Sequence, residues 1–234
     1  MVPLNDNNPT RITPYVTYWL IGLNLFIFLY EMSLSPPILE QFIRTWGVVP
    51  AELTANAPGE WITLFSSQFL HGGILHVGGN MLYLWVFGNN IEDKLGHARF
   101  IFFYLACGAL AALSQWFFSQ SSAVPLVGAS GAIAGIMGAY ILRFPKARIL
   151  TLIPIFFYIT TVRIPAYLFL GFWFVQQALY SVASLSVTTG GDAGGVAYWA
   201  HAGGFVFGAV LGPLLGLFDD QPPREGGRPI NRYR

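Results

Sequence analysis

Charged residues are absent from three long stretches of this chain, and this absence constrains its fold more than any other feature. The stretches hold 43 residues from Phe100 to Leu142, 28 from Ile164 to Gly191 and 26 from Ala193 to Phe218. Only 10% of the 234 residues are charged, whereas a soluble domain averages roughly 25%. Since a transmembrane helix needs about 20 apolar residues, the stretches predict membrane-spanning helices.

The apolar stretches predict six spans. The longest one holds two, because Pro125 and the serines before it give it a polar, helix-breaking middle. The predicted spans are about Tyr15–Met32, Gly72–Ile91, Phe100–Phe118, Leu126–Leu142, Ile164–Ala183 and Val196–Phe218. We therefore predict an all-α fold, a polytopic membrane bundle, with residues 15–218 as the six-helix domain. Residues 1–14 and the tail 219–234 are expected to be flexible cytoplasmic segments.

Two further segments need a different interpretation. The apolar stretch Ile149–Thr160 has only 12 residues and contains Pro154, so we expect an interfacial or buried loop rather than a seventh span. Between the first two spans, Ser33–His71 alternates prolines with aromatic residues, which favours short amphipathic pieces in the outer interface.

The basic residues predict the orientation of the bundle. Arg44 is the only Lys or Arg on one side of the predicted spans, and the other eleven are on the side that holds both termini. Lysine and arginine are enriched in cytoplasmic segments, so both termini are assigned to the cytoplasm. A net charge of +1 provides no basic surface for nucleic acid, and a single cysteine excludes an intramolecular disulfide.

Strongly polar residues inside spans are costly and are functional candidates by default. Besides the pair Gln176 and Gln177, they are His76, Asn80, Ser130 and His201. His76, Ser130 and His201 lie four or five residues into spans two, four and six, which run in the same direction. At 1.5 Å per residue this places all three roughly 6 to 8 Å below the outer surface. Asn80 follows His76 on the same helix face, one turn deeper.

Ser130 stands in the sequence Gly128-Ala-Ser-Gly131 at the predicted start of a helix. Small neighbours would let a substrate backbone approach, and the helix N-terminus offers free N–H groups to an oxyanion. A serine among small residues can equally be a packing contact between membrane helices. A buried imidazole needs a partner, however, so we predict a dyad in which His201 removes the Ser130 proton and later protonates the leaving amine.

Glycines predict that the dyad residues come close enough to react. Span four carries Gly131, Gly135 and Gly138, and span six carries Gly204, Gly208 and Gly212. Such small-xxx-small stripes let two backbones approach closely, so short side chains could meet across the interface.

Other groups complete the predicted site. His76 and Asn80 are placed to donate to a developing oxyanion beside the Ser130 backbone N–H, although each could instead form an interhelical hydrogen bond. Asp192 is the nearest acid to His201, in an external loop, and is a weak candidate for a third catalytic residue. Water for hydrolysis would need a polar route, for which Ser66, Ser67 and Gln68 are candidates.

Three motifs in order resemble those of the rhomboid intramembrane serine proteases. They are His71-Gly-Gly-Ile-Leu-His-Val-Gly-Gly-Asn80, Gly128-Ala-Ser-Gly131 and Ala200-His-Ala-Gly-Gly204 with Gly208. The resemblance implies a six-helix rhomboid bundle open to the outer side, Ser130 as nucleophile, His201 as base, His76 and Asn80 as oxyanion donors, and Gly128 beside them. It implies cleavage of membrane proteins in or near their transmembrane segments, without metal or cofactor. The sequence Gly88-Asn-Asn-Ile-Glu92 resembles the family's Gly-x-x-x-Glu, for which we predict a structural role.

Two family features are altered. The Trp-Arg pair of the first external segment is not intact, since Trp61 is followed by isoleucine, and the aromatic often found one turn after the nucleophile is Ala134. The partners we expect are the lipid bilayer and single-span substrates. The expected location is the inner (plasma) membrane, as a multi-pass protein.

The alternatives differ in the residues that they require. A zinc protease would need a His-Glu-x-x-His motif and an aspartyl protease two intramembrane aspartates, and the sequence has neither. A transporter would place its site at the midplane. An inactive rhomboid-like protein that only binds membrane clients stays open. The aromatic, glycine-poor fifth span (Phe169, Phe172, Trp173, Phe174) and the external cap loop are expected to move to admit substrate. Crosslinking spans two and five would test this hypothesis.

Overall fold

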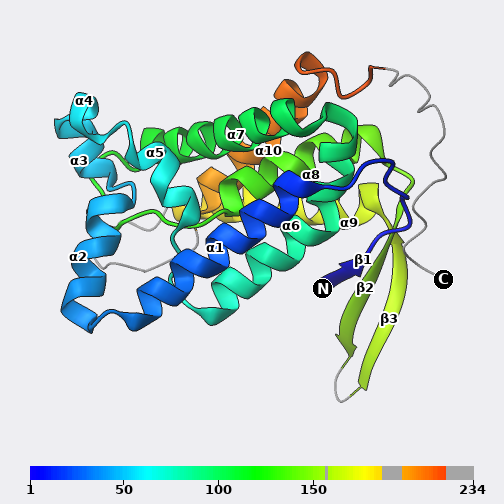
Figure 1. The fold of residues 1–234 in the computed structure, drawn as a ribbon, viewed down its shortest axis with the longest axis horizontal. Coiled ribbons are helices and arrows are strands. Elements are labelled where there is room, and N and C mark those ends of the chain that lie inside the picture. The colour runs from blue at the N-terminus through cyan, green and yellow to red at the C-terminus, as the bar shows by residue number, and fades with distance from the viewer. Residues whose placement is uncertain (156–157, 186–196, 220–234) are drawn as a thin grey trace.

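Six long helices form the bundle in the part of the chain that the structure describes. The computed structural model describes residues 1–155, 158–185 and 197–219 (Figure 1). The long helices are α1 (Tyr15–Ser33), α6 (Ile74–Leu95), α7 (His97–Phe118), α8 (Ser130–Arg143), α9 (Ala166–Ser184) and α10 (Tyr198–Leu214). By length and composition, α1, α7 and α9 could each cross a membrane. The predicted helical membrane bundle is therefore confirmed.

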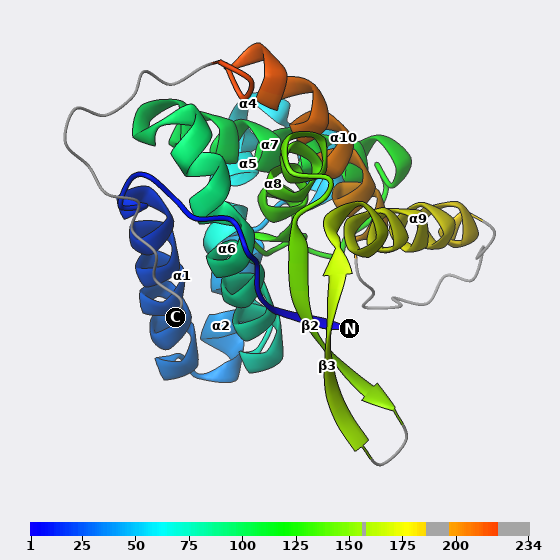
Figure 2. The same cartoon turned by 90° about the vertical axis from the view of Figure 1, so that its right-hand side faces the viewer.

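Helix α8 lies in the middle of the bundle, with α6, α7, α9 and α10 around it (Figure 2). Every residue from Gly131 to Tyr140 is buried. At 14 residues the helix is about 21 Å long, shorter than the roughly 30 Å hydrocarbon core. We predicted that this span begins at Leu126, but it begins four residues later, at Ser130.

The segment before α8 is extended because it pairs with the chain between α1 and α6. The backbone of Leu126 exchanges two hydrogen bonds with Val48, at 2.7 and 3.0 Å, and the Gly128 N–H donates to the Ser67 carbonyl at 2.9 Å. These bonds replace the first turn of the predicted helix. The late start places the N-terminus of α8 inside the bundle.

The segment between α1 and α6, where we expected short amphipathic pieces, forms short helices. They are α2 (Pro36–Trp46), α3 (Pro50–Ala55), α4 (Ala57–Glu60), α5 (Thr63–Ser66) and the 3₁₀ helix η1 (Ser67–Phe69). Helices α2 to α5 lie at the end of the bundle opposite to the chain's N-terminus (Figure 1).

A three-stranded antiparallel sheet corrects two of our expectations. Strands β2 (Arg148–Ile155) and β3 (Tyr158–Pro165) form a hairpin where we expected a loop, and β1 (Val2–Asn5) pairs with β2. The hairpin projects from one end of the bundle (Figures 1 and 2). An apolar stretch too short to span a membrane satisfies its backbone by strand pairing here. The expectation of a flexible segment 1–14 was wrong because its residues 2–5 pair with β2. The tail from 220 onward lies outside the described residues.

Asp6 holds the N-terminal segment against the bundle. Its carboxylate accepts hydrogen bonds from the Tyr140 hydroxyl of α8 and, at 2.9 Å, from the Asn90 amide of α6. Asn8 donates to the Tyr140 oxygen at 2.7 Å. These contacts join the chain's first residues to two helices of the bundle.

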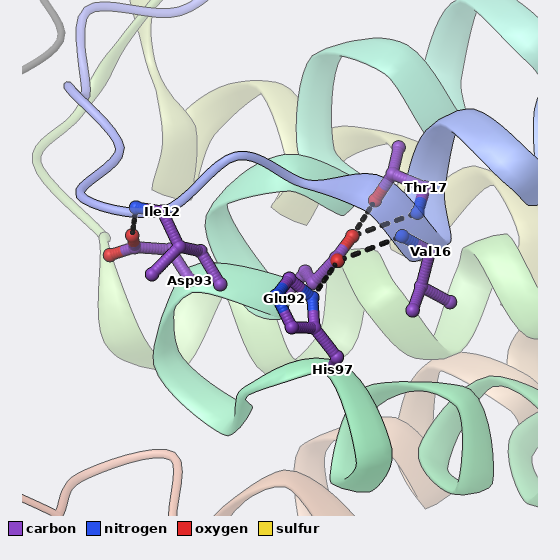
Figure 3. Close-up of polar contacts among 6 residues, drawn as sticks. All are labelled: Ile12, Val16, Thr17, Glu92, Asp93 and His97. Atoms are coloured by element: carbon purple, nitrogen blue, oxygen red, sulfur yellow. Dashed lines mark hydrogen bonds and ion pairs between the residues drawn. The ribbon is translucent and has the colours of Figure 1, made fainter.

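Glu92 and Asp93 hold the start of α1 (Figure 3). The buried Glu92 carboxylate accepts the Val16 and Thr17 N–H groups at 2.9 and 2.8 Å, the Thr17 hydroxyl at 2.6 Å, and contacts Nδ1 of His97 at 2.6 Å. Asp93 accepts the Ile12 N–H at 2.9 Å. The first N–H groups of a helix lack intrahelical partners, and an anion there is favourable. The structural role predicted for Glu92 is therefore confirmed.

Candidate active site

The first turns of two central helices bring Ser130 and His201 together. Ser130 is the first residue of α8 and His201 the fourth of α10. Ser130 Oγ lies 2.8 Å from Nε2 of His201. This is hydrogen-bond distance, so the two side chains that the sequence selected meet in the geometry that proton transfer requires.

Glycine contacts between α8 and α10 allow this approach. A Cβ on Gly204 would collide with the carbonyl oxygen of Gly131, and one on Gly208 with that of Gly135. The two backbones are therefore in direct contact, as the glycine stripes predicted. The close packing fixes the short serine side chain within reach of the histidine.

The other side of the His201 ring faces helix α9. Its Nδ1 lies 2.8 Å from Oε1 of Gln177, and the Trp173 ring lies 5.8 Å from the imidazole at 37°. Ala134, where the family often has an aromatic residue, is fully buried in α8. The sequence marked Gln177 as polar within a span but assigned it no role, because only the structure shows which helix face it occupies.

Gly128 brings His76 and Asn80 close to the serine. It has a left-handed φ of +124°, which strongly favours glycine. A Cβ there would lie 2.8 Å from Cε1 and Nε2 of His76 and 3.5 Å from Nδ2 of Asn80. Both side chains from α6 thus lie against the backbone that leads into Ser130.

Asn80 and His76 offer hydrogen-bond donors in this arrangement. Nδ2 of Asn80 is buried and has no hydrogen-bond partner among the described residues. The Gly72 N–H donates to Nδ1 of His76 at 3.4 Å, which leaves the proton of a neutral ring on Nε2. A buried donor without a partner is rare in native structures, and it is what a site awaiting a ligand oxygen would present.

A cavity of about 730 Å³ connects these groups. Its lining includes all five predicted site residues, Ser130, His201, His76, Asn80 and Gly128. Ser67 and Gln68 also line it, in keeping with the polar route we predicted. Ser66 does not line it, and its hydroxyl donates instead to the Trp46 carbonyl at 2.7 Å.

Glu31 is a polar residue near the site that the sequence analysis missed. It is buried in α1, inside the first predicted span, and its carboxylate accepts the His71 N–H at 3.2 Å. A carboxylate within a predicted span was the available signal. Asp192 lies outside the described residues. Within the described part of the chain, no group of three His, Cys, Asp or Glu side chains could hold a metal ion.

Comparisons with known proteins show which proteins this chain is similar to. A family model described as a rhomboid domain matches residues 58–218. The chain is 33% identical over 209 residues to "Rhomboid protease GluP" of Bacillus subtilis (strain 168), covering 88% of this chain and 36% of that protein. It is 26% identical over 204 residues to "Rhomboid protein 1, mitochondrial" of Saccharomyces cerevisiae, covering 84% and 52%. The chain thus spans about a third to a half of these relatives' length.

Proposed function

The chain belongs to the rhomboid family, and from this premise we propose that it is an intramembrane serine endopeptidase that cleaves membrane proteins in or near their transmembrane segments. The observation that carries the proposal is the 2.8 Å contact between Ser130 Oγ and His201 Nε2 at the wall of the cavity. One relative is itself named a protease, and the geometry supports serine chemistry for this chain.

The proposed reaction begins with proton transfer. His201 Nε2 accepts the Ser130 proton while Oγ attacks the carbonyl carbon of the scissile peptide bond. The negative charge on the carbonyl oxygen is stabilised by N–H donors from Asn80 Nδ2, His76 Nε2 and the Ser130 backbone. When the C–N bond breaks, the imidazolium protonates the leaving amine.

The second half of the reaction releases the acyl group. Water enters the cavity, His201 removes its proton, and the resulting hydroxide attacks the ester carbon. The C–Oγ bond then breaks and His201 returns the proton to Ser130. No step requires a metal or an organic cofactor.

The substrates we propose are single-span membrane proteins. A helical segment in lipid hides its carbonyls in internal hydrogen bonds, so the scissile region must unwind before its carbonyl can reach Ser130. We also propose the inner (plasma) membrane as the location, with both termini in the cytoplasm, because eleven of the twelve Lys and Arg residues lie on that side of the predicted spans.

The test is cleavage of a model transmembrane substrate by the purified protein in detergent, together with labelling by a fluorophosphonate. We expect wild type and the control Ser119→Ala to cleave and label, and Ser130→Ala to do neither. The Ser119 hydroxyl donates to the Gln115 carbonyl at 2.7 Å and accepts from the Gln115 amide at 3.3 Å, and it contacts neither Ser130 nor His201 in the described structure. Activity or labelling in Ser130→Ala would refute the assignment of the nucleophile. A folded wild-type protein that binds substrate without cleaving it would favour the inactive rhomboid-like alternative.

A further inference from the structure

The general base of the proposed reaction has two ring nitrogens, and each has a different partner. Nε2 contacts Ser130 on α8, and Nδ1 contacts Oε1 of Gln177 on α9, both at 2.8 Å. Gln177 is 8% exposed and does not line the cavity. It therefore reaches His201 from behind and does not touch a substrate in the cavity.

The Gln177 atom that contacts His201 determines which ring nitrogen of the neutral imidazole carries the proton. Oε1 accepts hydrogen bonds and cannot donate them, so Nδ1 must hold the proton of a neutral ring. Nε2 then presents a lone pair to the Ser130 hydroxyl, which is the tautomer that can act as general base. A donor at Nδ1 would select the opposite tautomer, with a proton facing Ser130 and no capacity to accept another.

The sequence neighbourhood of Gln177 supports a specific role. Trp173 is one turn earlier on the same helix face, and its ring lies beside the same imidazole. Within α8, the position one turn after the nucleophile is Ala134, which is too small to support the ring. The support for His201 thus comes from α9.

Resting on the proposed protease function, we propose that Gln177 is a positioning residue that fixes the tautomer and orientation of His201. The acceptor stabilises the neutral base before attack. It also accepts the Nδ1–H of the imidazolium that forms afterwards, when that hydrogen bond becomes charge-assisted and stronger. Gln177 thereby orients His201 as a third group behind Ser130 and His201, without carrying a charge.

The adjacent residue offers a matched control. Gln176 has the same side chain in the same helix, but its amide lies 3.4 Å from the Tyr180 hydroxyl and contacts neither Ser130 nor His201 in the described structure. Replacing either glutamine by methionine preserves length and flexibility and removes the acceptor. A general effect of a polar-to-apolar change in α9 would appear in both variants.

The experiment measures kcat and KM against pH for wild type, Gln177→Met, Gln177→Glu and Gln176→Met, with Ser130→Ala as blank. We expect Gln177→Met to lose about 10- to 100-fold in kcat, the size of a hydrogen bond to a charged group, with KM nearly unchanged. Gln176→Met should match wild type. Gln177→Glu retains the acceptor, so it should recover activity, with the acid limb of kcat at higher pH because a carboxylate favours the imidazolium.

The other titratable group that interacts with His201 among the described residues is His76, which is common to all variants and cannot cause a difference between them. Equal kcat in wild type and Gln177→Met would overturn the positioning role, while an inactive wild type would instead refute the proposed function. If Gln177→Met does not fold, ¹⁵N spectra of histidine-labelled wild type decide the question. A His201 protonated on Nδ1 supports the proposal, and one protonated on Nε2 contradicts it.

Discussion

Asn80 shows at the scale of one residue how a binding group can be recognised before its ligand is seen. Its amide nitrogen is buried with no hydrogen-bond partner among the described residues, although burial of an unsatisfied donor is costly. It lies against Gly128, where a Cβ would leave only 3.5 Å to Nδ2. In the proposed reaction, a donor held in this state would stabilise an oxygen that arrives with the substrate more than it stabilises the resting protein.

The first prediction concerns this donor. Asn80→Ala should lower kcat by about 10²- to 10³-fold, the usual effect of removing one oxyanion donor, and leave the thermal midpoint in detergent nearly unchanged, because the Nδ2 donor has no partner to lose. Asn80→Asp should lose more, since a carboxylate repels the oxyanion. Kinetics on a transmembrane substrate and a thermal scan of the same samples check this. A large fall in thermal midpoint with little change in kcat per folded molecule would show a structural role instead.

Helices α8 and α10 are the elements that bring Ser130 and His201 together. Their glycines place backbone against backbone, and this contact sets the distance between Ser130 and His201. Helix α6 contains glycines of a different kind, because a Cβ on Gly78 would have no atom within 4 Å. An added side chain should therefore be destabilising at the glycines between α8 and α10 and tolerated at Gly78.

The second prediction uses this contrast. Gly208→Ala would drive a methyl group into the Gly135 carbonyl, so it should destabilise the protein by about 2 kcal/mol or more and separate the dyad. Gly78→Ala, its matched control, should be neutral or slightly stabilising, because alanine is the better helix former. Thermal unfolding in detergent and kcat measure both effects. Equal stability of the two variants would contradict the close contact between α8 and α10.

Helix α9 contacts His201, the proposed base, and is also an element that we expect to move. It contributes Gln177 and Trp173 to the His201 environment, and Phe172 and Val175 on the same helix are more than half exposed. Movement of α9 to admit a substrate stays a prediction, as does movement of the cap loop. If α9 moves outward, it carries the Nδ1 acceptor with it, so substrate entry and the protonation state of the base would be coupled.

At the scale of the whole molecule, contacts between distant parts of the chain hold the fold together at the end that carries the sheet. Asp6 binds Tyr140 and Asn90, and Glu92 binds the start of α1. Burial raises the pKa of the Asp6 carboxyl from 3.8 to about 6, although the hydrogen bonds from Tyr140, Asn8 and Asn90 oppose this. The folded state therefore binds this proton more tightly than the unfolded chain does.

The third prediction follows from this difference. The stabilising effect of the Asp6 proton is complete below pH 3.8 and is lost as pH rises through about 6. Asp6→Asn is neutral at every pH and keeps an acceptor oxygen, so it should gain stability relative to wild type between pH 4 and pH 7. The difference in thermal midpoint between variant and wild type, measured across that range, isolates Asp6 from other carboxylates. A difference that does not change with pH would contradict the raised pKa.

The sequence by itself indicated which parts of the chain are apolar enough to enter a membrane and which side chains there are candidates for chemistry. The cost of charge in lipid separates the spans from the connecting segments, and the cost of a polar group in lipid makes Ser130, His201, His76 and Asn80 stand out locally. Repeated glycines indicated that two of the helices touch. All of these signals depend on residue type and spacing along one chain segment.

Only the tertiary structure decided what depends on distant partners. Strand pairing between residues 2–5 and β2, the late start of α8 opposite Val48 and the contact of Gln177 with His201 each join segments far apart in the sequence. A glutamine in an apolar helix has the same local pattern whether it faces lipid, a neighbouring helix or a catalytic base. The packing of α9 against α10 decides which of these surroundings Gln177 has, because hydrogen bonds act only over about 3 Å.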